Sequence, residues 1–540
     1  METRPEEKPE VGELPADPTR AQPPIEEKGQ ILDVSAAYTP EEEKRVVRKI
    51  DCTILPMMCV VFLLQYLDKQ SLSYASVFGL ITDLNMTSTQ YSWCSSIFYV
   101  GQLVAEYPFI YLMSRLHLTK FVGATMYVAL HTHDNSMIQL TNPSSVIWGV
   151  ICMCLAAPQN FAGFAAVRFL LGFTEGAVSP SFVTMTAIWY RKREHATRTA
   201  LWVSMNGVAQ VLGCLLMYGI GRTASGSSLQ PWRTLFLVCG ALTAAAGVAF
   251  YFLMPGGPKD CWFLTPREKE VLSLRMAQDR EGGDKTSFSV PQLREALLDP
   301  KAWFVFAFGV LVTMQSPVLT FASLVINTIG YDKYQTMLYT APSGAAQVLL
   351  LWIGVAGCSL FPHNRTLVVL ALIIPPFIGN VLLLKLSLDS GWGMIVSSWL
   401  NFACRINNQS RLDLQASCIT AVMSPLLSLA ASNVKGNTKR SVVNAMFFIG
   451  YCAGCIGAPQ LWTEKPRYFN GVVAGIVTWC LLFVVVFCYR WVCVADNVAR
   501  DKAQGQEVIS EGLGDITLDD HGAFRNDCTD KEDKQFRYSW

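Results

Sequence analysis

The sequence predicts an all-α polytopic membrane protein with twelve transmembrane helices. Of the 540 residues, 51% are hydrophobic and only 16% are charged, and the mean hydropathy is +0.30. The apolar residues fall in runs of about twenty, which is the length of a helix that crosses a bilayer. A polar stretch at residues 256–301 divides these runs into six and six. A large soluble core would not show this spacing.

The predicted elements follow one another in a regular order. Residues 1–45 are rich in Pro and Glu without apolar periodicity, which predicts a disordered cytosolic arm. Residues 46–255 contain predicted spans at 52–80, 91–113, 121–157, 161–189, 200–221 and 233–254. Beyond the central loop at 256–301, residues 302–495 contain spans at 302–327, 334–357, 366–386, 391–432, 441–462 and 470–494. Residues 496–540 are predicted to form a second disordered cytosolic tail.

The overall charge and the cysteines argue against several functions. The 43 basic and 42 acidic residues give a net charge of +1, which argues against a nucleic-acid partner. Most of the 17 cysteines lie in apolar runs without a metal-binding or redox context, so we expect core residues and no metal or cofactor. The central loop has no phosphate-binding motif, which argues against a nucleotide-driven pump. We expect a transporter rather than an enzyme.

The basic residues predict the orientation in the membrane. They gather before the first span, after the second, after the fourth and before the eleventh, which are joints on one side. Positively charged joints face the cytosol, so both tails and the central loop are expected there. Arg222, Arg233, Lys465 and Arg467 are exceptions on the opposite side. The residues that carry the prediction are Lys44, Arg45, Arg48, Lys49, Arg115, Lys120, Arg191, Lys192, Arg193, Arg198, Lys435, Lys439 and Arg440.

Two predicted spans, the third and the tenth, are interrupted by polar sequence. Residues 126–145 and 401–416 are loop-like, and the apolar pieces beside them are too short to cross a bilayer of about 30 Å. Lipid-exposed irregular backbone is not tolerated at membrane depth. We interpret both segments as inserts foreign to the working fold, such as translated intron sequence. A broken helix that lines a cavity is the alternative.

The first and fourth spans carry charges inside otherwise apolar sequence. Asp68 and Lys69 are adjacent, and Arg168 and Glu175 are seven residues apart, which is close to two helical turns and therefore one face. A charge at bilayer depth costs about 2.5–3.5 kcal/mol, so these side chains must face protein or a watery cavity. They form either a functional site or static ion pairs that hold the helices together.

Several longer motifs resemble a known family. They are Tyr66–Leu80, Gly163–Phe182, Trp202–Gln210, Glu295–Phe304 and Ser432–Ala445. Together they resemble fungal members of the major facilitator superfamily, in the anion:cation symporter group that contains the allantoate, nicotinate, pantothenate and biotin permeases. The resemblance spans about residues 45 to 500. It implies the major facilitator fold, two six-helix bundles around one central substrate site, with access alternating between the two sides.

The resemblance also implies roles for the four charged residues. Arg168 would bind the substrate carboxylate through its planar guanidinium, and Glu175 would load and release the coupling proton. Lys69 would offer a second cation without bidentate geometry. Asp68 would either titrate or neutralise Lys69. Arg115 and Lys120 lie where the superfamily has its cytosolic gating motif, although the usual Asp-Arg pair and glycines are absent.

Other polar residues in the spans are candidate substrate contacts. Gln102, Asn206 and Gln210 could hydrogen-bond either a ligand or a neighbouring helix. Gln315 and Asn444 are the candidates in the second half.

The resulting prediction is proton-coupled import of a small organic anion, such as a vitamin, ureide or sugar acid, across the plasma membrane. We expect a multi-pass monomer in the lipid bilayer, with protons and the anion as its partners. A non-transporting nutrient sensor of the same fold is one alternative. A chain made non-functional by its two inserts is the other.

Overall fold

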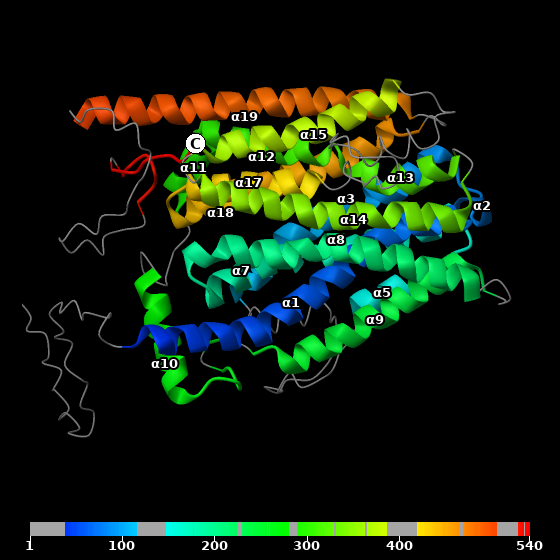
Figure 1. The fold of residues 1–540 in the computed structure, drawn as a ribbon, viewed down its shortest axis with the longest axis horizontal. Helices are drawn as coiled ribbons and strands as arrows, with labels where there is room; N and C mark the ends of the chain where they lie inside the picture. The colour runs from blue at the N-terminus through cyan, green and yellow to red at the C-terminus, as the bar shows by residue number, and fades with distance from the viewer. Residues whose placement is uncertain are drawn as a thin grey trace, which may run out of the picture.

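The computed structural model is a bundle of long, roughly aligned helices (Figure 1). It describes residues 38–540 except 116–146, 177, 224–228, 256, 259, 280–288, 329–330, 362–363, 386–417, 464–467, 505–527 and 534. The described residues contain helices and no strand. Eight of their helices are long and apolar enough to cross a membrane.

The helices of the N-half match the first six predicted spans. α1 (Pro40–Val77) has a capping box, in which the Thr39 hydroxyl accepts from the Glu42 amide and the Glu42 carboxylate accepts from the Thr39 amide. Pro40 occupies the first turn, where its missing N–H costs nothing. The remaining helices are α2 (Leu80–Asp83), α3 (Ser88–Arg115), α5 (Ile147–Cys154), α6 (Phe161–Glu175), α7 (Val178–Trp189), α8 (Lys192–Thr223) and α9 (Pro231–Leu253).

The central loop and the C-half complete the bundle. In the loop, α10 (Pro266–Asp279) lies across the start of α1, and α11 (Val290–Leu298) leads into α12 (Figure 1). The C-half consists of α12 (Pro300–Thr313), α13 (Ser316–Thr328), α14 (Lys333–Leu360), α15 (Arg365–Lys385), α17 (Cys418–Ser432), α18 (Asn437–Gly457), the 3-10 turn η3 (Ala458–Leu461) and α19 (Phe469–Gln504).

The long helices share two ends, which we name by the chain segments found there. At the terminal end, α1 and α18 begin and α19 finishes; the far end holds α2 and the start of α14 (Figure 1). The halves meet most closely where α8 crosses α14. A methyl group on Gly207 would overlap the carbonyl oxygen of Gly344, and the reverse also holds. Such small residues allow two membrane helices to approach backbone to backbone.

Three predictions about boundaries need comment. The suspected inserts at 126–145 and 401–416 lie outside the described residues; the next described helices begin at Ile147 and at Cys418. The fourth span is described as two helices, α6, which has Gly176 at its C-cap, and α7; residue 177 between them lies outside the described residues. The prediction of a disordered tail from residue 496 is wrong for the described part of it. α19 continues to Gln504, and residues 528–540 pack against the C-half with Thr529, Asp530 and Tyr538 buried.

Candidate functional site

The charged residues of α1 and α6 lie inside the N-half. Asp68 is completely buried in α1, and one of its carboxylate oxygens, Oδ2, accepts a hydrogen bond of 3.0 Å from the Thr243 hydroxyl of α9. Its other oxygen, Oδ1, has no hydrogen-bond partner among the described residues. The acid is therefore held in place by a neutral group rather than by its neighbour Lys69.

Lys69 instead pairs with Glu175. The Nζ atom of Lys69 lies 3.0 Å from Oε1 of Glu175, and their side chains are 19% and 1% exposed. The contact is an ion pair, and neither carboxylate oxygen of Glu175 has a hydrogen-bond partner within the described structure. The Lys69 ammonium also lies 5.8 Å from the centre of the Phe98 ring in α3. Three helices thus meet at this pair.

Arg168 is a buried cation with unused donors. Its residue is 2% exposed, and its guanidinium lies 5.9 Å from the centre of the Phe164 ring, one turn earlier in α6. Its Nε and Nη2 groups have no hydrogen-bond partner among the described residues. A buried unpaired cation is costly. The free donors form one edge of a planar fork that matches a carboxylate.

The other polar candidates of the N-half differ in what they already bind. Gln210 of α8 donates a hydrogen bond of 3.1 Å from Nε2 to the Ser343 hydroxyl of α14, so it joins the two halves. Its Oε1 atom, Oε1 of buried Gln102 in α3 and Oδ1 of half-buried Asn206 in α8 have no hydrogen-bond partner in the described part of the chain. These three amide oxygens remain able to accept donors from a ligand.

Gln315 and Asn444 are the candidate substrate contacts in the C-half. Gln315 lies between α12 and α13, where Nε2 donates to the Gly475 carbonyl at 2.9 Å and to the Thr478 hydroxyl at 2.5 Å, and Oε1 accepts from Asn380 at 3.4 Å. The structure therefore gives Gln315 a full set of helix partners in α15 and α19. Asn444 is half-buried in α18.

The predicted gating residues lie at and beyond the last described residue of α3. Arg115 is the last residue of α3, and the placement of its side chain is outside the described structure. Lys120 lies outside the described residues altogether.

Two partners were not predicted from the sequence. Thr243 holds Asp68, and Ser343 holds Gln210, yet each is a lone hydroxyl in an apolar helix and carries no sequence signal. Nothing in their spacing distinguishes them from ordinary packing residues. Within the described residues, no group of three or more His, Cys, Asp or Glu side chains is arranged to hold a metal ion.

Contacts between the halves lie at the level of the site and toward the far end. In the first such contact, Ser73 of α1 donates to the Thr320 carbonyl at 2.9 Å and lies 2.5 Å from the Ser323 hydroxyl, both in α13. In the second, the Tyr334 hydroxyl of α14 donates to the Gly221 carbonyl of α8 at 2.9 Å. The Arg222 guanidinium lies 4.8 Å from the centre of the Tyr334 ring.

At the terminal end, ion pairs form within each half. Arg275 of the loop helix α10 binds both Glu43 of α1 and Glu194 of α8 on the N-half. Lys439 of α18 on the C-half binds Glu295 of the loop helix α11 and Asp299. Each half is thus consolidated separately at this end.

Comparison with known proteins now identifies the family. The protein-family model described as Major Facilitator Superfamily matches residues 142–459, more than half of the chain. An uncharacterized transporter of Schizosaccharomyces pombe is 30% identical over 94% of this chain and 90% of its own length. The allantoate permease of Saccharomyces cerevisiae is 28% identical over 93% of this chain and 87% of the permease.

Solved structures agree in fold. The partially occluded, inward-open xylose transporter XylE from E. coli has a TM-score of 0.54 at 14% identity, covering 80% of this chain and 96% of that one. This likeness speaks for the fold alone. The predictions of a multi-pass all-α fold, of a transporter rather than an enzyme, and of a resemblance to allantoate permease-like proteins are confirmed. This chain is a secondary transporter that belongs to the Major Facilitator Superfamily.

Proposed function

We propose that this transporter imports a small organic anion together with protons, and that Arg168 and Glu175 are the centre of its site. The observation that carries the proposal is the buried Arg168 guanidinium, whose Nε and Nη2 groups lack partners in the described structure. A substrate carboxylate would satisfy both donors with two parallel hydrogen bonds. The anion would also neutralise a charge that is expensive at membrane depth.

The Lys69–Glu175 pair supports coupling of the anion to a proton. While Glu175 is ionised, it holds the Lys69 ammonium at 3.0 Å and competes with any substrate anion for that cation. A proton on Glu175 removes this attraction. Lys69, the more exposed partner, then becomes free to meet a carboxylate. Binding of the anion and binding of the proton therefore favour each other, which is what symport requires.

Asp68 is a second acid in the same region, and we assign it a supporting role. Its carboxylate accepts a hydrogen bond from Thr243, and Lys69 pairs with Glu175 instead. The open acceptors of Gln102, Asn206 and Gln210 would receive hydroxyl or amide donors of the substrate. This combination of one carboxylate and several donors fits a vitamin, a ureide or a sugar acid.

The contacts between the halves support access from the terminal end. The Ser73–Ser323 and Tyr334–Gly221 contacts draw the halves together toward the far end. Among the described residues, the ion pairs of the terminal end do not join the N-half to the C-half. We assign the terminal end to the cytosol, and its basic residues support this assignment under the positive-inside rule. We assign the protein to the plasma membrane as a monomer with both termini in the cytosol.

The number of protons determines the driving force. One proton with one monovalent anion moves no net charge, so only the pH gradient drives uptake. A second proton would add about 2.3 kcal/mol per 100 mV of membrane potential, which is nearly a fifty-fold gain in accumulation.

Uptake of labelled carboxylates tests the proposal. Cells that express the chain are screened with vitamins, ureides and sugar acids at pH 5 and pH 7, and the best substrate is carried into variants. We expect Glu175→Gln to abolish accumulation driven by the pH gradient while exchange of internal for external substrate persists. Arg168→Lys should collapse the affinity, because a lysine cannot form the bidentate contact.

Glu268→Gln is the matched control for the acid. Glu268 pairs with Lys49 at 2.8 Å at the terminal end, so its removal should leave accumulation unchanged. If Glu175→Gln still concentrates substrate against its gradient, Glu175 is not the proton carrier. Wild-type kinetics in Arg168→Lys would show that bidentate recognition is absent.

A further inference from the structure

The last thirteen residues of the chain pack on the terminal end of the C-half. We call residues 528–540 the C-terminal segment. It returns from the end of α19 and lies beside α11, where the red ribbon passes near α19 and α18 (Figure 1). Three of its side chains, Thr529, Asp530 and Tyr538, are buried. This burial shows that the segment is held against the C-half by specific contacts.

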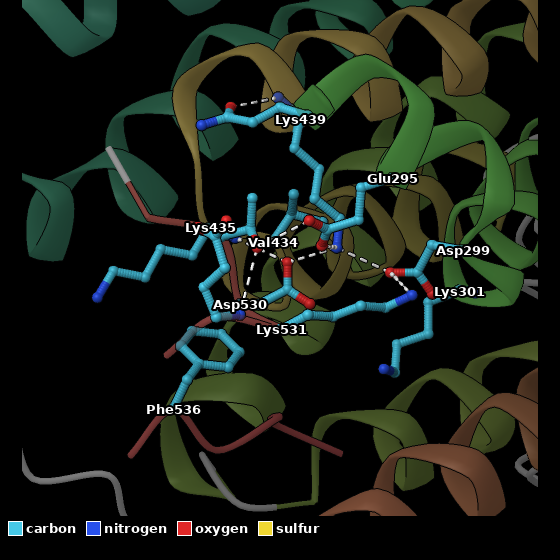
Figure 2. A network of polar contacts seen from close by, with 12 residues as sticks. Glu295, Asp299, Lys301, Val434, Lys435, Lys439, Asp530, Lys531 and Phe536 are labelled. Atoms are coloured by element: carbon cyan, nitrogen blue, oxygen red, sulfur yellow. Dashed lines mark hydrogen bonds and ion pairs between the residues drawn. The ribbon is translucent and has the colours of Figure 1, made fainter. Parts of the chain in front are cut away.

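Lys439 is the first anchor of the segment. Its Nζ atom, at the start of α18, lies 2.8 Å from Glu295, 2.8 Å from Asp299 and 2.7 Å from Asp530, and Figure 2 shows these carboxylates converging on it. Glu295 and Asp299 accept hydrogen bonds from this ammonium, and Asp530 forms an ion pair with it. The side chains of Lys439 and Asp530 are each 1% exposed. If the segment left, this ammonium would lose one of its three carboxylate partners.

Docking leaves the net charge of the cluster unchanged. Asp530 arrives together with Lys531, whose ammonium lies 3.8 Å from Asp299 (Figure 2). One acid and one base are therefore added at once. Burial opposes ionisation of Asp299, but the hydrogen bond and charge of Lys439, with the charges of Lys301 and Lys531, hold its pKa below its usual value.

Tyr538 is the second anchor. Its hydroxyl donates to Asp530 at 2.8 Å and accepts from Arg500 of α19 at 2.9 Å. Its backbone forms a reciprocal pair with Asn497, with hydrogen bonds of 3.0 and 2.9 Å. The Lys301 ammonium, at the start of α12, lies 3.8 Å from the centre of its ring. The segment is thus joined to both α19 and α12.

The loop between α17 and α18 provides the third anchor. The Asn433 side chain accepts from the Ser539 amide at 2.7 Å and donates to the Ser539 carbonyl at 2.8 Å. Lys435 pairs with Asp533 at 2.5 Å. The Arg490 guanidinium lies 4.3 Å from the centre of the Trp540 ring. Every anchor described here belongs to the C-half or to α11.

We propose that this surface is a docking site for the chain's own C-terminal segment, which acts as a reversible clamp on the ends of α11, α18 and α19. Ion pairs and amide contacts hold the segment, together with Phe536, Tyr538 and Trp540, which pack with the hydrophobic core of the C-half. Interfaces that open and close mix polar and apolar contacts in this way. Residues 505–527 join the segment covalently to α19, and such a linkage raises the effective concentration of the segment at its site. The occupant is therefore the same molecule and not a second copy.

Hydrogen exchange on the full-length protein in detergent micelles tests the clamp. In the wild type we expect slow exchange in residues 528–540, in α11 and in the first turns of α18. Asp530→Asn should speed exchange in all three by tenfold or more while α3 and α6 stay unchanged. Gln535→Ala is the matched control, because its side chain is exposed, and it should behave as the wild type. Equal exchange in Asp530→Asn and the wild type would overturn the proposal.

A synthetic peptide of residues 528–540 gives a second measurement. It should bind saturably to a chain that ends at residue 527 and at least tenfold more weakly to the full chain, where the site is already filled. The Asp530→Asn peptide should bind the shortened chain at least tenfold more weakly than the native peptide. Failure of the native peptide to bind, or loss of protection in the full chain on dilution, would exclude an intramolecular clamp. Neither measurement needs a transport substrate, so its outcome is independent of the proposed function.

Discussion

The Lys69–Glu175 pair offers the sharpest test of the site, because the chain contains a second pair with similar geometry in different surroundings. Lys69 and Glu175 lie 3.0 Å apart with side chains that are 19% and 1% exposed. Lys49 and Glu268 lie 2.8 Å apart with side chains that are 39% and 13% exposed. The N···O distances of the two pairs are nearly equal, so a difference between their coupling energies reports how deeply each pair is buried.

A double-mutant cycle on each pair measures that energy. The variants are Glu175→Gln, Lys69→Met and their combination, with Glu268→Gln, Lys49→Met and their combination as the control. Removing one partner of a buried pair costs about 3–5 kcal/mol, because the remaining charge is left uncompensated. Exposed pairs contribute about 0.2–1 kcal/mol. We expect a coupling energy of about 2–3 kcal/mol for Lys69–Glu175, near the top of the range for residues in contact, and below about 1 kcal/mol for Lys49–Glu268.

Unfolding in mixed micelles of mild detergent and dodecyl sulfate supplies the free energies. The double variant at positions 69 and 175 should recover most of the stability that Glu175→Gln loses, because it removes both charges. Equal coupling energies for the two pairs would refute the reasoning. It would mean that water reaches Glu175 as freely as it reaches Glu268, and that the burial seen in the structure does not shape its electrostatics.

Three further predictions concern packing, a helix contact and pH. Gly172→Ala should destabilise the protein by about 1–3 kcal/mol in the same unfolding assay, because the new methyl group would overlap the Phe98 carbonyl. Gly219→Ala is the control: nothing lies within 4 Å of its new methyl group, so it should be neutral or slightly stabilising. Gln315→Ala should lower stability by about 1–3 kcal/mol without changing substrate affinity; lost affinity at full stability would place Gln315 in the substrate site instead. Burial raises the pKa of Asp533, but the hydrogen bond and charge of Lys435 and a backbone N–H outweigh it and leave the pKa lowered. The contribution of Asp533 to docking of the C-terminal segment should therefore be fully present well above pH 3.8, the ordinary pKa of an aspartate, and be lost as the pH falls below that value. Loss of protection from hydrogen exchange between pH 7 and pH 5 would contradict this prediction.

Most of the fold follows from patterns that the sequence carries locally. Hydrophobic runs report helices, since a backbone in lipid must satisfy its own hydrogen bonds. All twelve predicted spans contain helix among the described residues, with the third and tenth seen only in part. The ends of helices are also local. The Thr39 capping box starts α1, and Asp299 caps α12 by accepting from the Lys301 amide at 3.1 Å.

The site was predicted only as far as residue type and helix face allowed. Charges in an apolar span mark Asp68, Lys69, Arg168 and Glu175 because insertion is costly wherever they point. The partners of these residues could not be predicted. Lys69 lies next to Asp68 in the chain but pairs with Glu175 from another helix, and Asp68 accepts a hydrogen bond from Thr243. Adjacent residues on a helix point in different directions, so the neighbour in sequence is not the neighbour in space.

The buried charges and the C-terminal segment show most clearly what the sequence determines and what the tertiary structure decides. By itself the sequence determined the transmembrane helices, their order and the identity of the buried charges, because each depends on hydrophobicity over one or two helical turns. Only the tertiary structure decided that Lys69 serves Glu175, that Arg168 keeps free donors and that Asp530 reaches Lys439. These pairings join residues from separate segments, and their energy depends on burial and direction, which exist only once the helices have packed.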